Sequence, residues 1–176
     1  MNELSELLRC INYQFKDINL LKRALTHSSF GKSEENYEKL EFLGDRVLGL
    51  VISMNIFNNF KMDSEGELAK KLAFLVCKDT LKKVASRINL HKYLRVSKEL
   101  NSSSIESIKA NSLEALIAAI YLDSDLKKTE EIINRLWKEE IDGIDLSNHD
   151  PKSRLQEWCL KKDNKLPEYE FISKEG

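Results

Sequence analysis

Residues 37–58 read YEKLEFLGDRVLGLVISMNIFN, a long stretch rich in apolar residues. Its apolar side chains recur at helical spacing, which predicts one long helix. They are Leu40, Leu43, Val47, Leu50 and Met54. An apolar-rich helix of this length needs other elements to cover it, and the chain offers further helical patterns on both sides. We therefore expect an all-α domain built around this segment.

The flanking sequence predicts several more helices, most with a recognisable start. Asp17 is suited to cap a helix over INLLKRALTH, and Asp79 is suited to cap TLKKVASRI. Ser64 and Glu67 form a Ser-x-x-Glu capping box that opens ELAKKLAFLV. Apolar periodicity predicts two further helices, over about 105–122 and about 127–140.

The sequence pattern changes after residue 143. The stretch that follows is polar and has no periodicity, which is typical of a linker. Asp150 and Pro151 then suit the start of a helix, and YEFIS alternates like a strand. We expect a helical domain at 1–143, a linker at 144–149 and an incomplete α/β module at 150–176.

Composition restricts the class of protein. Six Gly and two Pro among 176 residues argue against an all-β fold with many tight turns. No apolar run approaches the ~20 residues that cross a bilayer, and no signal peptide is evident, so no membrane partner is expected. The three cysteines form no paired motif, which favours the reducing cytoplasm. With a net charge of −1, nucleic acid would have to bind a local basic surface or metal ions held by acidic residues.

Two polar clusters on apolar helices are candidates for chemistry. Glu38, Glu41 and Asp45 occupy positions i, i+3 and i+7, so their carboxylates share one helix face. Asn111 and Glu114 lie one turn apart in the run KANSLEALIAAIYL. Mg²⁺ prefers oxygen ligands from a few carboxylates and keeps several waters. Two facing helices with these side chains would form such a site, which suits hydrolysis by metal-activated water.

Each candidate also has a plainer interpretation. Glu38 near a helix start can simply favour the helix dipole, and Asn111 can simply cap a helix. Asp45 is harder to dismiss, because Asp is a poor residue for a helix interior. Glu114 is a lone carboxylate among apolar neighbours and needs a metal, a cation or a proton as its partner. A salt bridge to Lys or Arg is the competing interpretation.

Residues 38–46, EKLEFLGDR, resemble the signature of the ribonuclease III family. The segments LLKRALTHSS, EGELAKKLAFLVCKDTL and SLEALIAAIYLDSD also follow the family's order and spacing, so the resemblance covers residues 10–140. The stretch 150–176 is similar to the first helix and strand of a double-stranded-RNA-binding domain. The resemblance implies an all-α endonuclease domain followed by part of that binding domain.

This resemblance implies a homodimeric enzyme that cleaves double-stranded RNA. Water activated by Mg²⁺, which Mn²⁺ can replace, would hydrolyse the phosphodiester bonds, and no small-molecule cofactor is expected. Products would carry 5′-phosphate and 3′-hydroxyl ends with two-nucleotide 3′ overhangs. The expected role is processing of ribosomal and other RNA.

Carried over position by position, the resemblance implies that Glu41, Asp45 and Glu114 hold the catalytic Mg²⁺. Glu38 would help to position substrate or metal. Asn111 departs from the pattern, because the family's best-known members carry Asp there. Its carbonyl is still an oxygen ligand, but a neutral one, which puts the metal affinity in question.

Other residues are implicated in binding. Phe42 would pack against the partner of the homodimer, although on general grounds an aromatic side chain among leucines belongs to the core. Contacts to the RNA minor groove are implied for the first helix of the binding domain, at Ser153, Gln156 and Glu157. Basic side chains that could contact phosphates, although a solvated helix face explains most of them, are Lys70, Lys71, Lys78 and Lys82.

Two other functions stay open. A non-catalytic relative that binds structured RNA is favoured if Asn111 prevents metal binding, and a cleavage assay with Mg²⁺ decides this. An all-helical nucleotide pyrophosphohydrolase also uses Glu-x-x-Glu and Mg²⁺, but its second acidic pair should follow much closer in sequence. Deoxynucleoside triphosphates as substrates would identify that activity.

Overall fold

A computed structural model describes residues 4–30, 38–97 and 102–144, together with Cys159, Lys162 and Pro167; within 102–106 it describes the backbone only. The chain divides into two units, Met1–Gly143 and Ile144–Gly176. In the second unit, Cys159 and Lys162 are helical. The candidate RNA contacts Ser153, Gln156 and Glu157 lie outside the described residues, as does the expected strand YEFIS.

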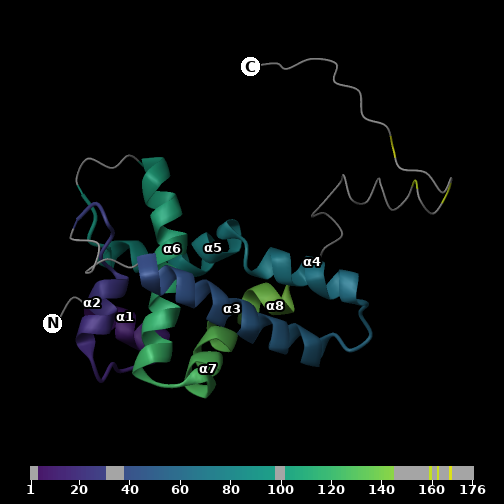
Figure 1. Cartoon of the computed structure of the whole chain (residues 1–176), viewed down its shortest axis with the longest axis horizontal. Coiled ribbons are helices and arrows are strands. Elements are labelled where there is room, and N and C mark those ends of the chain that lie inside the picture. The colour runs from purple at the N-terminus through teal and green to yellow at the C-terminus, as the bar shows by residue number, and fades with distance from the viewer. Residues whose placement is uncertain are drawn as a thin grey trace, which may run out of the picture. The chain divides into compact units, whose positions relative to one another are not determined.

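The first unit is helical, as the sequence predicts (Figure 1). Among the described residues, extended backbone is paired only in an isolated parallel bridge between Thr26 and Arg95. The elements are α1 (Leu4–Ile11), α2 (Ile18–Ala24), α3 (Glu38–Asn59), α4 (Glu65–Leu75), α5 (Lys78–Arg87), the 3-10 helix η1 (Leu90–Tyr93), α6 (Ser102–Asp123), α7 (Leu126–Leu136) and α8 (Lys138–Asp142).

Helix α6 is the centre of this unit. It contacts α2, α3, α5 and α7, and Figure 1 shows α3 crossing it. Apart from Glu114, its residues 113–120 are apolar, and an apolar stretch of this kind needs cover on most sides, which is why so many elements surround it. Residues on α6 that are at most 1% exposed are Ala110, Ser112, Leu113, Ala115, Leu116, Ile117, Ala118, Ala119 and Ile120.

Helix α3 carries apolar side chains on two faces. One face, which includes Leu40, Val47 and Leu48, is buried in the core. Leu50 and Met54 belong to the same helical apolar pattern, but they are 50% and 38% exposed. The helix has more apolar positions than one packing face can hold, so the remainder lie at the surface of the chain.

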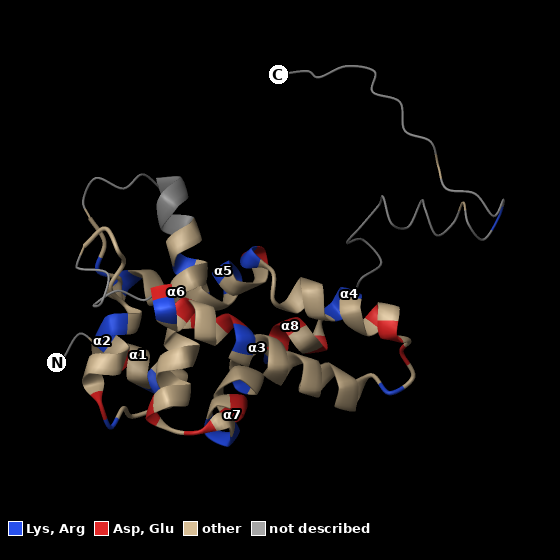
Figure 2. Cartoon of the chain, viewed as in Figure 1, with Lys and Arg blue, Asp and Glu red and all other residues tan. Residues whose placement is uncertain are grey.

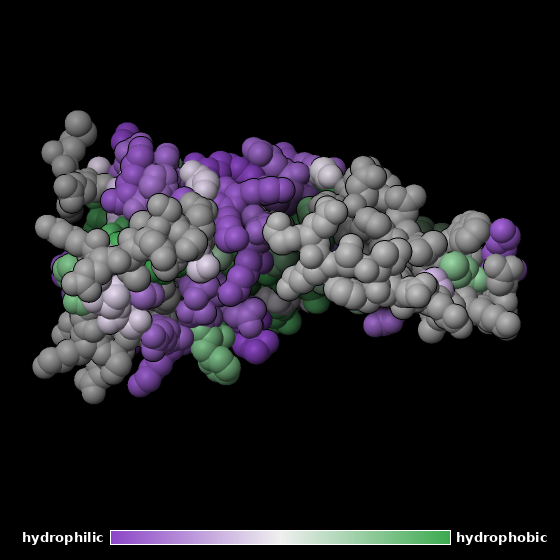
Figure 3. All heavy atoms as spheres, turned by 90° about the horizontal axis from the view of Figure 1, so that it is seen from above, coloured by the Kyte–Doolittle hydropathy of each residue, from purple (hydrophilic) through white to green (hydrophobic). Residues whose placement is uncertain are grey.

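We call the surface side chains Phe42, Leu50, Met54 and Phe57 the exposed apolar set of α3. The expectation that Phe42 is a core residue is wrong, because its side chain is 69% exposed, and Phe57 is 70% exposed. Elsewhere, the described surface seen from above in Figure 3 is mainly hydrophilic, with hydrophobic side chains in small groups. Exposed aromatic side chains on a long helix are typical of a surface that binds another protein.

Local hydrogen bonds explain where several helices start. Asp17 accepts a bond from the Asn19 amide at 2.9 Å, which confirms it as the cap of α2. The capping box of α4 is also confirmed, since Ser64 accepts from the Glu67 amide at 3.4 Å and Glu67 accepts from the Ser64 amide at 2.8 Å. These bonds satisfy amide groups that helix starts leave without partners.

Two local predictions are wrong. Helix α5 begins at Lys78 with Cys77 at the cap position, and Asp79 lies inside the helix, where it pairs with Lys82 at 3.0 Å. The helix expected over 127–140 is two helices, because α7 ends at Leu136. The fully buried Trp137 follows it, and its indole N–H donates to the Leu75 carbonyl at 2.9 Å.

Membrane insertion finds no support in the part of the chain that the structure describes. None of its helices combines the length and the apolar character that spanning a bilayer requires.

Candidate active site

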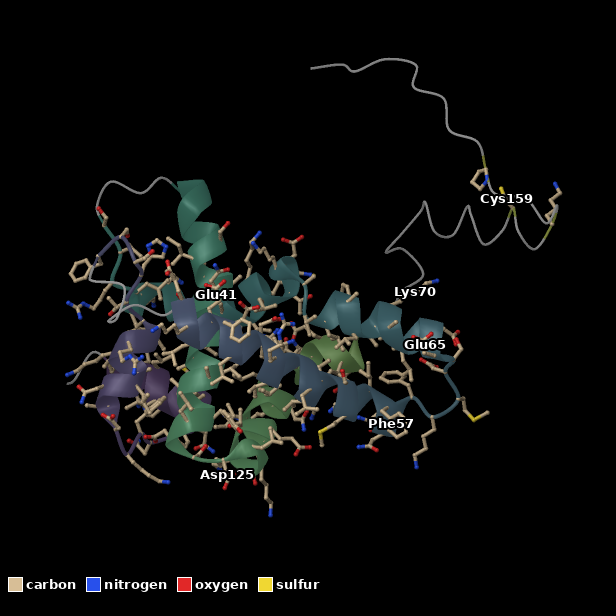
Figure 4. All side chains as sticks on the ribbon, viewed as in Figure 1. Glu41, Phe57, Glu65, Lys70, Asp125 and Cys159 are labelled. Atoms are coloured by element: carbon tan, nitrogen blue, oxygen red, sulfur yellow. The ribbon has the colours of Figure 1, made fainter. Side chains whose placement is uncertain are left out.

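The site begins with a close contact between α3 and α6. A Cβ atom added at Gly44 of α3 would lie 1.8 Å from the backbone carbonyl oxygen of Glu114 on α6. Only glycine allows the two backbones to approach so closely. The side chains on either side of Gly44 therefore lie beside those of the Glu114 turn. Figure 4 labels Glu41 next to this crossing.

A pocket of about 470 Å³ opens at this crossing. Helix α3 contributes four of its lining residues, α6 two and the first turn of α5 one. Figure 2 shows acidic segments of α3 and α6 near the crossing, and charged residues at the start of α5. The lining residues are Glu38, Glu41, Phe42, Asp45, Lys78, Asn111 and Glu114. The structure thus brings together all five of the predicted acidic and amide residues, from two separate parts of the sequence.

Glu114 lies half-buried on α6 between fully buried apolar neighbours. The pKa of its carboxyl is raised from 4.5 to about 7: burial is the largest cause, repulsion from Asp45 and Glu41 contributes, and Lys78 opposes the rise. The competing interpretation, a salt bridge, is not formed: among the described residues, Glu114 makes no ion pair with Lys or Arg. The carboxyl therefore sits in a place that favours either a proton or a cation.

Glu41 and Asn111 are linked across the two helices. Burial raises the pKa of Glu41, a hydrogen bond with the Asn111 side chain lowers it, and Lys78 also lowers it. The interpretation of Asn111 as a helix cap is wrong, because α6 starts at Ser102 and Asn111 lies in its interior. Its amide instead faces the carboxylate of the opposite helix.

The two remaining carboxylates are more accessible to solvent. Glu38 is exposed in the first turn of α3, where a negative charge also favours the helix dipole. Asp45 lies 3.1 Å from the Arg46 guanidinium, and its side chain is 42% exposed. Exposed pairs of this kind contribute little to stability, so Asp45 remains available for another cation.

The chemistry of the pocket fits a hard divalent cation. Carboxylate and amide oxygens are the protein ligands that Mg²⁺ prefers, and repulsion among the carboxylates marks a place short of positive charge. Within the described ranges, however, no three His, Cys, Asp or Glu side chains already stand together as a metal-binding cage. The fit therefore rests on the donor chemistry, and the carboxylates would have to draw closer around an ion.

The structure also separates the four lysines that the sequence left as one group. Lys78 lines the pocket. Lys71 instead pairs with Asp63 at 2.5 Å, and Lys82 pairs with Asp79 at 3.0 Å. Lys70 is exposed on α4, away from the labelled Glu41 (Figure 4). Sequence reasoning did not find Gly44, although a glycine in a long helix, directly before a candidate ligand, is a signal for close packing.

Comparison with known protein families identifies relatives over most of the chain. The family model described as Ribonuclease-III-like matches residues 17–140. Ribonuclease 3 of Rickettsia bellii (strain OSU 85-389) is 43% identical over 188 residues, an alignment that covers 100% of this chain and 81% of that protein.

Solved structures show the same similarity. Two solved structures of the nuclease domain of ribonuclease III from Campylobacter jejuni each superpose on this chain with a TM-score of 0.75. They are 40% and 41% identical to this chain, covering 80% and 82% of it and 99% and 100% of their own length. The first was described for structural flexibility in a region involved in dimer formation.

Proposed function

The chain belongs to the ribonuclease III family and is an endonuclease of that family, and we propose that it hydrolyses double-stranded RNA with the help of Mg²⁺. One observation carries this proposal. Three carboxylates and an amide that lie far apart in sequence, on α3 and α6, line one pocket beside a contact that only Gly44 permits.

In this proposal the pocket residues have separate tasks. Glu41, Asp45 and Glu114 hold Mg²⁺, or Mn²⁺ in its place, and the Asn111 carbonyl adds a neutral ligand. When bound, the ion lowers the pKa of water and offsets the charge of the leaving oxygen. Glu38, in the exposed first turn of α3, helps to position the substrate at the mouth of the pocket. The hydrogen bond from Asn111 orients Glu41.

The reaction in this proposal leaves a 5′-phosphate and a 3′-hydroxyl, with two-nucleotide 3′ overhangs on short duplex products. The substrates are precursors of ribosomal and other RNA. The domain organisation belongs to the same proposal: residues 1–143 are the endonuclease domain, 144–149 a linker, and 150–176 part of a double-stranded-RNA-binding domain.

Cutting both strands requires two such pockets, and we propose that a homodimer supplies them. The exposed apolar set of α3 is the contact surface, and Phe42 links it to the pocket because it belongs to both. Burial of these side chains against a second copy gives the hydrophobic free energy that holds the dimer together. The solved Campylobacter jejuni domain, with its region involved in dimer formation, supports this proposal.

The test uses the full chain and a long RNA duplex. We expect cleavage with Mg²⁺, no cleavage with EDTA, and recovery when Mg²⁺ is returned. End-labelled products should show the stated termini. Deoxynucleoside triphosphates, offered under the same conditions, should remain intact. Binding of the duplex without cleavage in Mg²⁺ would contradict the proposal and would favour a non-catalytic RNA-binding protein.

A further inference from the structure

Lys78 is an unusual member of an acidic pocket. The pocket is lined by four carboxylates, and Lys78 is the one cation among its described lining residues. It comes from α5, an element that contributes nothing else to the lining, in the first turn of that helix. Packing of α5 against α6 fixes where this turn lies.

The pocket has a floor and a rim. Glu114 on α6 is half-buried, whereas Lys78 and Phe42 are exposed. A substrate that enters the pocket therefore meets Lys78 before it meets Glu114. The ammonium group is coupled to the inner carboxylates, since it lowers the pKa of both Glu41 and Glu114.

Charge balance indicates what Lys78 binds during the reaction. Without a divalent cation, the ammonium offsets part of the repulsion among the carboxylates. A divalent cation bound by those carboxylates would repel the ammonium, and it would also neutralise the negative charges that the ammonium otherwise faces. The phosphate of a bound RNA strand offers non-bridging oxygens as replacement partners, and a flexible lysine on the rim can reach them as a point charge.

We propose that Lys78 binds the phosphate group at which the RNA strand is cut. This inference rests on the proposed function and adds to it a substrate contact from α5. Hydrolysis forms a bond from the water oxygen to phosphorus and breaks the bond from phosphorus to O3′, which takes up a proton. The non-bridging oxygens carry negative charge throughout, and the Lys78 ammonium stabilises that charge in a pocket that is otherwise acidic.

The experiment compares Lys78→Gln, Lys78→Arg and the control Lys83→Gln in the full chain. Lys83 is an exposed residue of the same helix that does not line the pocket. Binding of a short RNA duplex is measured by fluorescence anisotropy at one fixed Ca²⁺ concentration over a series of KCl concentrations. Cleavage is measured in Mg²⁺ under single-turnover conditions at saturating enzyme. Melting curves check that each variant is folded.

For Lys78→Gln we expect a shallower slope of the logarithm of the RNA-binding constant against the logarithm of the KCl concentration. The slope should decrease in magnitude by about 1, because one phosphate contact is lost. Single-turnover cleavage should fall about 10- to 100-fold. Lys78→Arg should keep the parent slope, because the charge is retained, and Lys83→Gln should cleave at the parent rate.

Either of two results for Lys78→Gln would overturn this inference: cleavage at the parent rate, or a cleavage defect with the parent's salt slope. The second would mean that Lys78 acts on the carboxylates and not on phosphate. If the parent itself fails to cut duplex RNA, the proposed function and this inference fall together. A parent that cuts, beside an equally active Lys78→Gln, removes only this inference.

Discussion

Glu114 is the residue on which the chemistry depends most. A carboxylate between buried apolar neighbours would be strongly unfavourable if it stayed ionised and alone. Burial, together with repulsion from two nearby carboxylates, raises its pKa to about 7. A cation in the pocket would keep this group ionised, so its environment suits a metal ligand.

The first prediction concerns stability and pH without divalent cations. The pKa of Glu114 in the folded chain, about 7, lies above the 4.5 of a free carboxyl. The folded state thus binds more protons than the unfolded state between these values, so stability is lost as pH rises through this window. The Glu114→Gln variant has no such loss. Its free energy of unfolding should equal that of the parent at about pH 4. At about pH 8 it should exceed that of the parent by about 1–2 kcal/mol, a figure already reduced because Glu114 is partly exposed.

Denaturant unfolding in EDTA at several pH values measures this difference. Adding Mg²⁺ at the higher pH should stabilise the parent and leave Glu114→Gln unchanged. A constant stability difference across the whole pH range would contradict the assigned environment of Glu114.

Asn111 gives a second prediction at this scale. Replacing it with Asp adds a carboxylate next to Glu41, and anionic oxygen attracts Mg²⁺ more strongly than amide oxygen. Repulsion among the acids also makes the metal-free pocket less stable. Asn111→Asp should therefore melt slightly earlier without metal, gain more stability from Mg²⁺, and reach half-maximal cleavage at a lower Mg²⁺ concentration. Titrations of cleavage rate against Mg²⁺ that superimpose for variant and parent would remove Asn111 from the site.

The sequence could predict the residues of the pocket but not all of its chemistry. Helical spacing placed Glu38, Glu41 and Asp45 on one face, and the apolar surroundings of Glu114 marked it as unusual. The contribution of Lys78 depends on where α5 packs against α6, which no local pattern encodes.

At the scale of elements, the contact of α3 with α6 decides the geometry. Gly44 has the Glu114 backbone directly against it, whereas Gly49 on the same helix has nothing within 4 Å of an added Cβ atom. Glycine is a poor helix former, by about 1 kcal/mol relative to alanine. Its presence at position 44 is explained by the close approach, and the sequence alone does not reveal that partner.

These two glycines give a matched test. Gly44→Ala must push α3 away from α6 and should destabilise the chain by about 1–3 kcal/mol. It should also lower cleavage, because the ligands from the two helices separate. Gly49→Ala should be neutral or stabilising by up to about 1 kcal/mol. Urea unfolding and single-turnover cleavage measure both effects, and equal stabilities of the two variants would show that the contact does not constrain the helices.

Element boundaries were predictable where local hydrogen bonds set them. The caps of α2 and α4 involve residues a few positions apart, so the sequence shows both partners. Helix α7 ends at Leu136, and the next residue is Trp137, whose indole reaches the distant Leu75 carbonyl. A residue-by-residue pattern cannot show such a contact, and it also does not separate α7 from α8 within the continuous helix predicted over 127–140.

At the scale of the whole molecule, the exposed apolar set of α3 is a hydrophobic surface that a single chain does not bury. Sequence periodicity places Leu50 and Met54 in the apolar pattern of α3, and each is exposed on a single copy. A pattern of apolar residues cannot distinguish burial within a chain from burial between chains. In the proposed homodimer, one face of α3 is buried within its own chain and the exposed apolar set is buried against the second copy.

Phe42→Ala tests this proposal. Removing a large, 69% exposed aromatic side chain from the contact surface should weaken the dimer at least about tenfold without unfolding the chain. Leu122→Ala, which truncates a 51% exposed side chain at the far end of α6, should leave the dimer unchanged. Sedimentation equilibrium gives both dissociation constants. Equal constants for the two variants would place the interface elsewhere.

We propose that the pocket at the crossing of α3 and α6 is where RNA is cut. Its most direct test is single-turnover cleavage of a long RNA duplex by the parent, by Glu114→Gln and by the control Glu131→Gln, whose side chain pairs with Lys128 on α7. The amide at position 114 removes a charge at nearly constant volume. We expect the parent and Glu131→Gln to cut equally in Mg²⁺, and Glu114→Gln to lose about 100-fold or more of the rate while keeping its fold and its dimer. Cleavage by Glu114→Gln at close to the parent rate would contradict the account.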